Sequence, residues 1–153
     1  MMRIGLVAIG VIALTTFGLW VASSAGGQGV RQPEAVDIQA GGRLYAENCA
    51  SCHGADLEGQ PEWRTPGPDG RFPAPPHDET GHTWHHGDAM LFDYTRLGGQ
   101  AALAESGVKG YESGMPAFGE RLSDREIWNI LAYIKSTWPD RIRGVQAERS
   151  AMQ

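Results

Sequence analysis

The sequence is poor in three features that would point to common classes of protein. It has only two cysteines in 153 residues, which excludes a scaffold built from several disulfides. It has no excess of positive charge, because 13 lysines and arginines face 18 acidic residues, and a nucleic-acid-binding protein normally carries a basic face. After residue 30, valine and isoleucine nowhere alternate with polar residues, so no β-strand is predicted.

The longest apolar stretch lies at the N-terminus. Residues 4–22 form an uncharged run of 19 residues after Arg3, and small residues follow up to Gly27. Two interpretations stay open. A run of about 18 or more residues can span a bilayer as an uncleaved anchor, which we favour, whereas the small residues ending at Ala25 fit a cleaved secretory signal. Both place the rest of the chain outside the cytoplasm, with the N-terminus of an anchor inside.

Glycine and proline, with 21 and 9 residues, predict long loops between few helices. Residues 54–87 contain six of the prolines and are expected to be mostly irregular. Helices are expected over residues 36–49, capped by Asp37, and from Asp88 as the N-cap to the pair Gly98-Gly99. Three helices make a thin core for about 100 residues, so another group is expected to fill the middle.

The last predicted helix has the clearest start. Ser123 and Glu126 have the spacing of a capping box, in which each side chain accepts a backbone N–H of the other residue. Pro139 is expected to end the helix. Between them runs an apolar stripe made of Ile127, Ile130, Leu131, Ile134 and Trp138. The charged residues after it are expected to be frayed.

Both cysteines belong to a C-x-x-C-H motif, Cys49 to His53, which is typical of covalent haem attachment. Two thiols on one helical turn can each bond one vinyl group of a porphyrin, and His53 then offers its imidazole to the iron. Other interpretations fit less well. A thioredoxin-like centre needs a βαβ context, a structural zinc site needs a second ligand pair, and a surface disulfide leaves His53 without a role. We predict one haem c per chain.

The second axial ligand is predicted to be Met115. It lies in the loop Gly114-Met115-Pro116-Ala117-Phe118, which lacks a helical pattern. Met90 lies on a predicted helix face, where methionine more often fills the core. The other candidates are His77, His82, His85 and His86. A backbone carbonyl of residues 73–76 is expected to accept a hydrogen bond from His53 and so orient its ring.

With these parts in order, the chain resembles a monohaem class I c-type cytochrome over residues 37–138. The resemblance implies an all-α class I cytochrome c fold, three or more helices and long loops wrapped around one covalent haem, with the N-terminal hydrophobic helix in addition. It implies His53 as the proximal and Met115 as the distal ligand. It also implies that the first and last helices cross, with Gly42 and Tyr45 against the face of Trp128 and Tyr133.

The interval between His53 and Met115 is longer than in the smallest members of that family and is rich in histidine. His82 and His86 have the i,i+4 spacing that places two side chains on one helix face. A second metal, copper or zinc, held by His77, His82, His85 and His86 is the less favoured interpretation, because no closed set of four ligands is evident. We favour loop capping, contact with the haem propionates or exposure to water.

The function expected from these ligands is one-electron transfer, without catalysis by the chain itself. His/Met ligation fills both axial positions and leaves no site for oxygen or peroxide. The chain is then a carrier in a respiratory-type chain, or a subunit of an oxidoreductase complex. It is expected on the periplasmic side of the cytoplasmic membrane, or soluble in the periplasm after cleavage. Alternatives are a haem enzyme or sensor, and a copper-handling redox protein.

Transient docking of redox proteins is expected. Residues 31–140 contain 9 basic and 17 acidic residues, so a basic or neutral partner surface is expected, unless the acidity serves only solubility. The predicted divisions are residues 1–25 as anchor or signal, 26–36 as tether, 37–140 as cytochrome c domain and 141–153 as charged tail.

Overall fold

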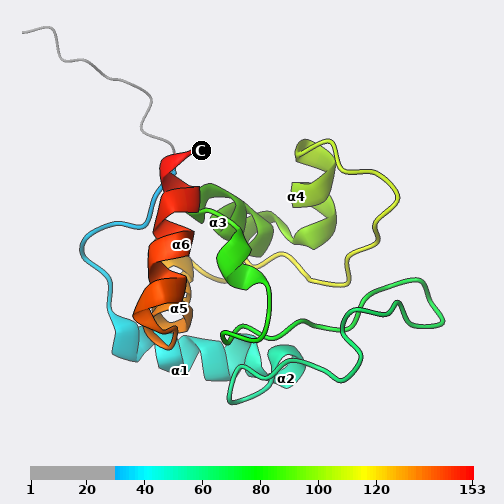
Figure 1. Cartoon of the computed structure of the whole chain (residues 1–153), viewed down its shortest axis with the longest axis horizontal. Coiled ribbons are helices and arrows are strands. Elements are labelled where there is room, and N and C mark those ends of the chain that lie inside the picture. The colour runs from blue at the N-terminus through cyan, green and yellow to red at the C-terminus, as the bar shows by residue number, and fades with distance from the viewer. Residues whose placement is uncertain (1–29) are drawn as a thin grey trace, which may run out of the picture.

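The computed structural model describes residues 30–153, and the predicted anchor or signal lies outside these residues. The described part is all-helical, which confirms the expected fold class (Figure 1). Among its helices, none combines the length and the apolar character that crossing a bilayer requires. The elements are α1 (Ile38–Asn48), α2 (Ala50–His53), the 3₁₀ helix η1 (Thr83–His85), α3 (Asp88–Leu97), α4 (Gly99–Glu105), α5 (Asp124–Ser136) and α6 (Asp140–Ala151).

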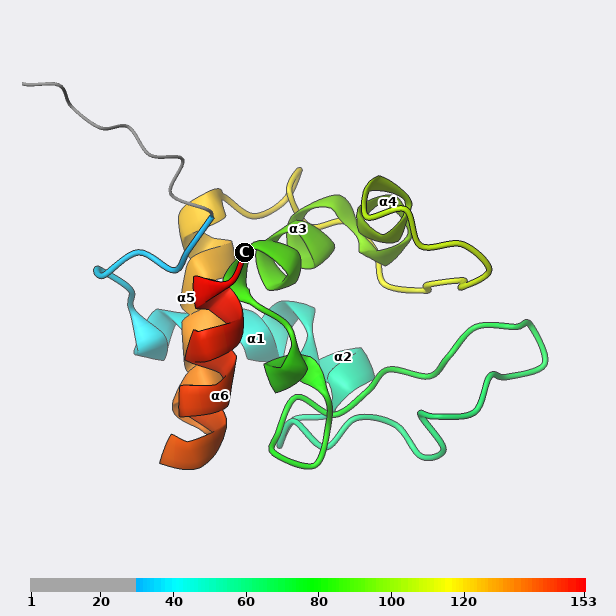
Figure 2. The ribbon, with the colours of Figure 1, turned by 45° about the horizontal axis from the view of Figure 1, so that its top comes forward.

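Helices α1 and α5 cross in close contact, as expected for the first and last predicted helices (Figure 2). The glycine at the closest approach is Gly41, because a Cβ built there would lie 1.9 Å from the backbone oxygen of Asn129. Gly42, the glycine expected at the contact, lies beside it and faces the ring of Tyr133. Tyr45 packs on the same ring, with 5.5 Å between ring centroids. The crossing is confirmed, and its tightest point is one residue earlier than expected.

The start of α5 confirms the predicted capping box. The Ser123 backbone N–H donates to Glu126 Oε2 at 2.8 Å, and the Glu126 N–H donates to Ser123 Oγ at 3.4 Å. The predicted apolar stripe is buried throughout and makes up much of the core. Trp128 faces another way than the resemblance implied: its ring stacks on Phe92 of α3, with 4.6 Å between centroids.

Helix α3 begins one residue differently from the prediction. Gly87 is the N-cap and Asp88 is the first helical residue, because the Asp88 side chain is engaged elsewhere in the fold. Gly98 ends α3 with a φ of +83°, a conformation that favours glycine. The chain then re-enters a helix at once, and this second helix, α4, has no counterpart in the prediction.

The C-terminal residues form α6, which contradicts the expected frayed tail. Ile142 is 1% exposed, and Gln146 and Ser150 are buried on the same helix face. This face packs against η1 and α3 (Figures 1 and 2). The apolar residues of this helix, Ile142, Val145 and two alanines, are too few to give a clear amphipathic pattern, so the helix depends on contacts with the rest of the fold.

The contacts that fix α6 converge on Asp88. Its carboxylate accepts a hydrogen bond from the Gln32 backbone N–H at 2.8 Å, another from Gln146 Nε2 at 2.8 Å, and an ion-paired one from Lys135. Its backbone N–H donates to Ser150 Oγ at 3.0 Å. Burial raises the pKa of this carboxyl, but the hydrogen bonds from Lys135, Gln32 and Gln146 outweigh it and lower the pKa below its ordinary value.

Candidate functional site

The two cysteines and His53 lie on one helical turn at the end of α1. Cys49 ends α1, and its carbonyl oxygen accepts the backbone N–H groups of Cys52 at 3.1 Å and His53 at 3.0 Å. Cys49 is buried, Cys52 is exposed, and both thiols are free. The turn therefore presents two thiols, one from inside the fold and one from its surface, to a group bound beside it.

The properties of Cys49 argue against a thiol redox centre. Burial, with a further contribution from the nearby Cys52, raises the pKa of the Cys49 thiol to about 11. Thioredoxin-like centres instead lower the pKa of the attacking cysteine, so that it is a thiolate near neutral pH. No strand occurs in residues 30–153, so the βαβ context is missing as well.

The ring of His53 is oriented by the backbone. Its Nδ1 lies 2.9 Å from the carbonyl oxygen of Pro75, which can only accept, so Nδ1 carries the proton and donates. This confirms the expected carbonyl from residues 73–76 and identifies which residue supplies it. The lone pair is then on Nε2, which makes that nitrogen the metal-binding one. Burial lowers the pKa of His53, and the hydrogen bond to Pro75 opposes this only in part.

A second histidine lies against His53. The rings of His53 and His77 are stacked, with 4.0 Å between centroids and 21° between planes. Burial, with the neighbouring His53 and His82, holds the pKa of His77 well below its ordinary value. The sequence indicated His77 only as one member of a histidine-rich stretch. Its place beside His53 depends on the path of the long loop, which no local pattern reveals.

Met115 lies in a loop that is fixed to the corner between α3 and α4. The Gly99 N–H donates to the Met115 carbonyl oxygen at 3.0 Å, and the Met115 N–H donates to Ser113 Oγ at 3.3 Å. A Cβ on Gly98 would lie 2.8 Å from the backbone nitrogen of Ala117, so only glycine fits where the α3–α4 corner meets the Met115 loop. The Met115 side chain is partly buried and packs against the main hydrophobic core.

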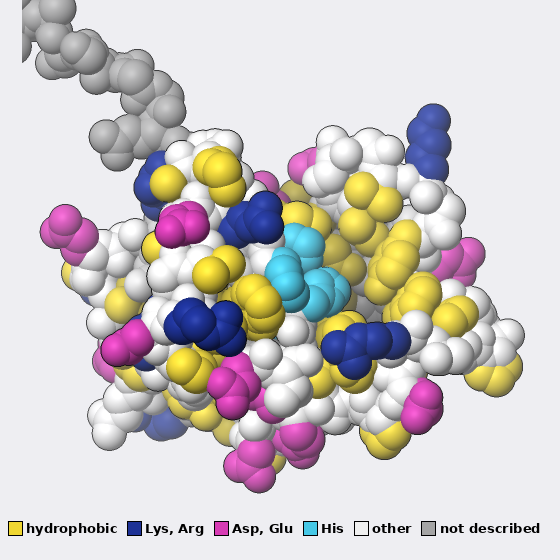
Figure 3. Space-filling model, in the orientation of Figure 1, with side chains coloured by type: hydrophobic (Ala, Val, Ile, Leu, Met, Phe, Trp, Pro, Cys, Tyr) yellow, Lys and Arg dark blue, Asp and Glu magenta, His cyan; other side chains and the backbone are white. Residues whose placement is uncertain are grey.

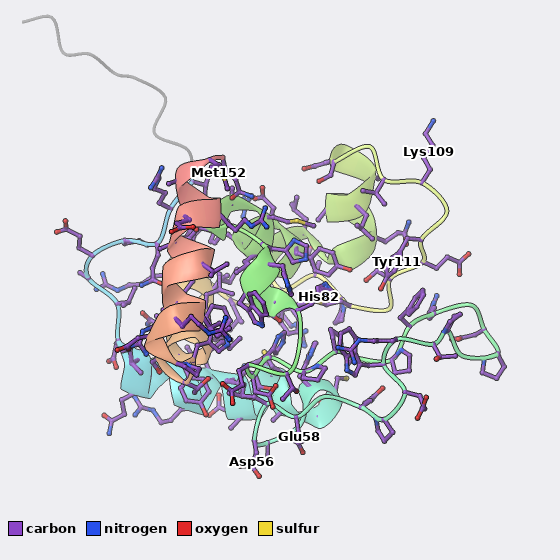
Figure 4. The ribbon with its side chains drawn as sticks, viewed as in Figure 1. Asp56, Glu58, His82, Lys109, Tyr111 and Met152 are labelled. Carbon is purple, nitrogen blue, oxygen red and sulfur yellow. The ribbon has the colours of Figure 1, made fainter. Side chains whose placement is uncertain are left out.

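The long loop after His53 reaches across to the Met115 loop. Its tip, a fold-back closed by the Gln60 N–H bond to the Ala74 oxygen at 2.8 Å, extends to one side in Figure 2. Phe72 from this tip stacks on Tyr111, which follows α4 (Figure 4), with 4.9 Å between centroids and 6° between planes. The segments that carry the two predicted axial ligands are therefore in direct contact.

The remaining histidines gather in the middle of one face, with hydrophobic side chains on both sides (Figure 3). His82 lies 5.7 Å from the Trp63 ring and 5.0 Å from the His86 ring, and His85 stacks on Trp84 at 3.6 Å. Burial, with His82, His85 and Arg149 nearby, lowers the pKa of His86 to about 4. Within residues 30–153, no three His, Cys, Asp or Glu side chains converge to hold a metal ion.

The donor set fits covalently bound haem. Two free thiols lie on one helical turn, an imidazole beside them has its Nε2 available, and a thioether is held on an adjoining loop. Comparison with known sequences agrees, since the family model described as Cytochrome c matches residues 38–138. The chain belongs to the cytochrome c family. Covalent haem c is therefore its cofactor, and Cys49 and Cys52 are positioned as the attachment pair.

This cytochrome c also resembles one curated protein. It is 28% identical over 108 residues to the Cbb3-type cytochrome c oxidase subunit FixP of Bradyrhizobium sp. (strain ORS 278). The match covers 71% of this chain but only 30% of that relative, so the chain spans less than a third of its length. No solved structure matches the sequence significantly. The class of fold and the cofactor follow from the family.

Proposed function

We propose that this cytochrome c is a one-electron carrier in which His53 and Met115 are the axial ligands. The observation that carries the proposal is the hydrogen bond from His53 Nδ1 to the Pro75 oxygen at 2.9 Å. It fixes the tautomer and leaves Nε2 as the ligand atom, on the same turn as both attachment cysteines. When bound, haem c supplies an iron that alternates between the ferrous and ferric states.

Met115 supports the proposal as the partner of His53. Its loop is tied to α4 through Gly99 and touches the long loop that follows His53 through the Phe72–Tyr111 stack. With both axial positions filled from the chain itself, a small substrate such as oxygen or peroxide has no position to bind. A thioether ligand favours the ferrous state and raises the reduction potential relative to a second histidine.

The ligand assignment is tested by the far-red charge-transfer band of ferric haem with a methionine ligand. We expect the band in the wild-type protein, its loss in Met115→Ala and its retention in Met90→Ala. Met90 is the matched control, because it is a partly buried methionine on α3. A wild-type spectrum without the band, or loss of the band only in Met90→Ala, would refute Met115 as the ligand.

We further propose an exported, membrane-associated role as a carrier or oxidase-complex subunit of a respiratory-type chain. The similarity to the FixP subunit and the apolar sequence of residues 4–22 support it. The acidic balance of residues 31–140 indicates a basic or neutral docking surface on the partner, reached over less than about 1,200 Å² of interface.

Fractionation of cells tests the membrane association. The haem stain of the full chain should appear in the membrane fraction, and a version that carries a cleavable signal in place of residues 1–25 should appear in the soluble periplasmic fraction. If cells that express the full chain give a haem-stained protein in the soluble fraction that lacks residues 1–25, the N-terminal segment is a cleaved signal and not an anchor. Added salt should slow electron transfer to the partner, because exposed charges are screened.

A further inference from the structure

We propose that His77 is a positioning residue for the proximal ligand: its ring lies flat against that of His53 and fixes the plane in which His53 binds the iron. The inference rests on the proposed function, since it takes His53 as the axial ligand. It adds a residue 24 positions beyond the attachment motif that local sequence does not connect with the haem.

The ring of His53 has rotational freedom that its own side chain does not remove. The χ2 torsion of histidine is broad, so rotation of the ring about its bond to Cβ is weakly restrained by the side chain itself. The hydrogen bond to Pro75 holds one edge of the ring at 2.9 Å. The His77 ring covers one face, at 4.0 Å between centroids and 21° between planes. An edge contact and a face contact together restrict the ring to one plane.

His77 can give this support because it is itself held from several sides. Its Nδ1 is hydrogen-bonded to the hydroxyl of Thr83 at 2.8 Å. Its backbone N–H donates to the Leu57 oxygen at 2.8 Å, and its carbonyl oxygen accepts from Trp138 Nε1 at 2.7 Å. Its ring also meets the ring of Tyr45 edge to face, with 6.1 Å between centroids and 72° between planes.

Three of these partners, Tyr45, Leu57 and Trp138, are 20 or more residues away from His77 in the sequence, and all of the partners are buried. Thr83 is 7% exposed and Trp138 is 2% exposed. Thr83 belongs to η1, which packs against α6, and Trp138 lies between α5 and α6. The C-terminal helix that the sequence did not predict therefore supports the segment that holds the His53 ring.

The orientation of the ring has a measurable electronic consequence. In ferric haem, the plane of an axial imidazole determines how the two iron d orbitals of π symmetry split. That splitting sets the spread of the g values in electron paramagnetic resonance. A residue that fixes the plane of a ligand ring therefore changes the electronic structure of the iron without contacting the iron itself.

The experiment compares His77→Phe with His77→Leu in the holoprotein. Phenylalanine keeps a flat ring against His53, whereas leucine is of similar size but not flat. We expect g values like the wild type for His77→Phe and a changed spread for His77→Leu. His85→Leu is the matched control, because the exposed His85 ring stacks on Trp84 and not on His53. The stacking role is overturned if the Phe and Leu variants give the same spectrum, whether changed or unchanged.

Two measurements separate this inference from the proposed function. The intact mass shows whether haem is attached, and the far-red band shows whether methionine is the second ligand. A wild-type protein that fails either measurement refutes the proposed function, whatever His77 does. If His77→Leu does not mature, Thr83→Val decides, since it removes the hydroxyl that holds the His77 ring. For Thr83→Val we expect the g-value spread to change in the same direction as expected for His77→Leu, but by less. An unchanged spectrum overturns the inference.

Discussion

The crossing of α1 and α5 gives the sharpest test of the fold, through Gly41→Ala. A Cβ on Gly41 would lie 1.9 Å from the Asn129 oxygen and 2.5 Å from its carbonyl carbon. An ordinary carbon–oxygen contact is about 3.3 Å or more, so the helices would have to separate by more than 1 Å. The obstacle is helix backbone, which cannot rotate away as a side chain could.

The magnitude follows from two opposing effects. Overpacking a close contact costs about 1–3 kcal/mol, and here the upper end applies because rigid backbone must move. The better helix propensity of alanine returns about 1 kcal/mol. We therefore expect Gly41→Ala to lose about 2 kcal/mol of unfolding free energy. Gly144→Ala in α6 is the control: outside the backbone of its own helix, no atom lies within 4 Å of the added Cβ, and we expect a gain of about 0.5–1 kcal/mol.

Urea unfolding of the two holoproteins, followed by circular dichroism, measures both values. The m-values should equal that of the wild type, so that the midpoints report stability alone. If Gly41→Ala is as stable as Gly144→Ala, the close helix crossing described for Gly41 is wrong.

Three further substitutions test the contacts around α6. Ile142→Ala should cost about 2–5 kcal/mol, since Ile142 is 1% exposed; a cost near zero in urea unfolding would mean that α6 is frayed after all. Asp88→Asn should lower the unfolding free energy at pH 7. The hydrogen bonds that lower the pKa of Asp88 favour its charged carboxylate, and they stabilise the fold above about pH 4, where the carboxylate is charged. That loss should shrink as the pH falls below this value and Asp88 takes up a proton. The pKa of His86 is lowered to about 4 in the folded protein. As the pH falls from 6.5 to 4, this histidine therefore takes up a proton in the unfolded chain but not in the folded one, and the unfolding free energy decreases. His86→Gln should make urea midpoints less dependent on pH over that interval than His85→Gln does.

The local chemistry was predictable because it depends on residues close together in sequence. The Cys49–His53 turn brings its three side chains together within one helical turn, wherever the turn lies in the fold. The capping box of Ser123 and Glu126 is satisfied within four residues, so its spacing alone identified the start of α5.

The secondary structure was less predictable where a helix depends on distant partners. Helix α6 buries one apolar side chain, Ile142, within a mostly polar sequence, and it is stable because Gln146 and Ser150 form hydrogen bonds with Asp88. Helix α4 follows α3 without the loop that two glycines usually indicate, because the α3–α4 corner packs against Ala117.

The sequence by itself determined the cofactor and the residues that attach it, because a covalent motif carries its chemistry in five consecutive positions. Only the tertiary structure decided that Pro75 accepts from His53, that His77 covers its ring and that Gly41 marks the helix crossing. These three contacts join segments 22 or more residues apart. Their geometry depends on the packing of the whole core, which no local pattern encodes.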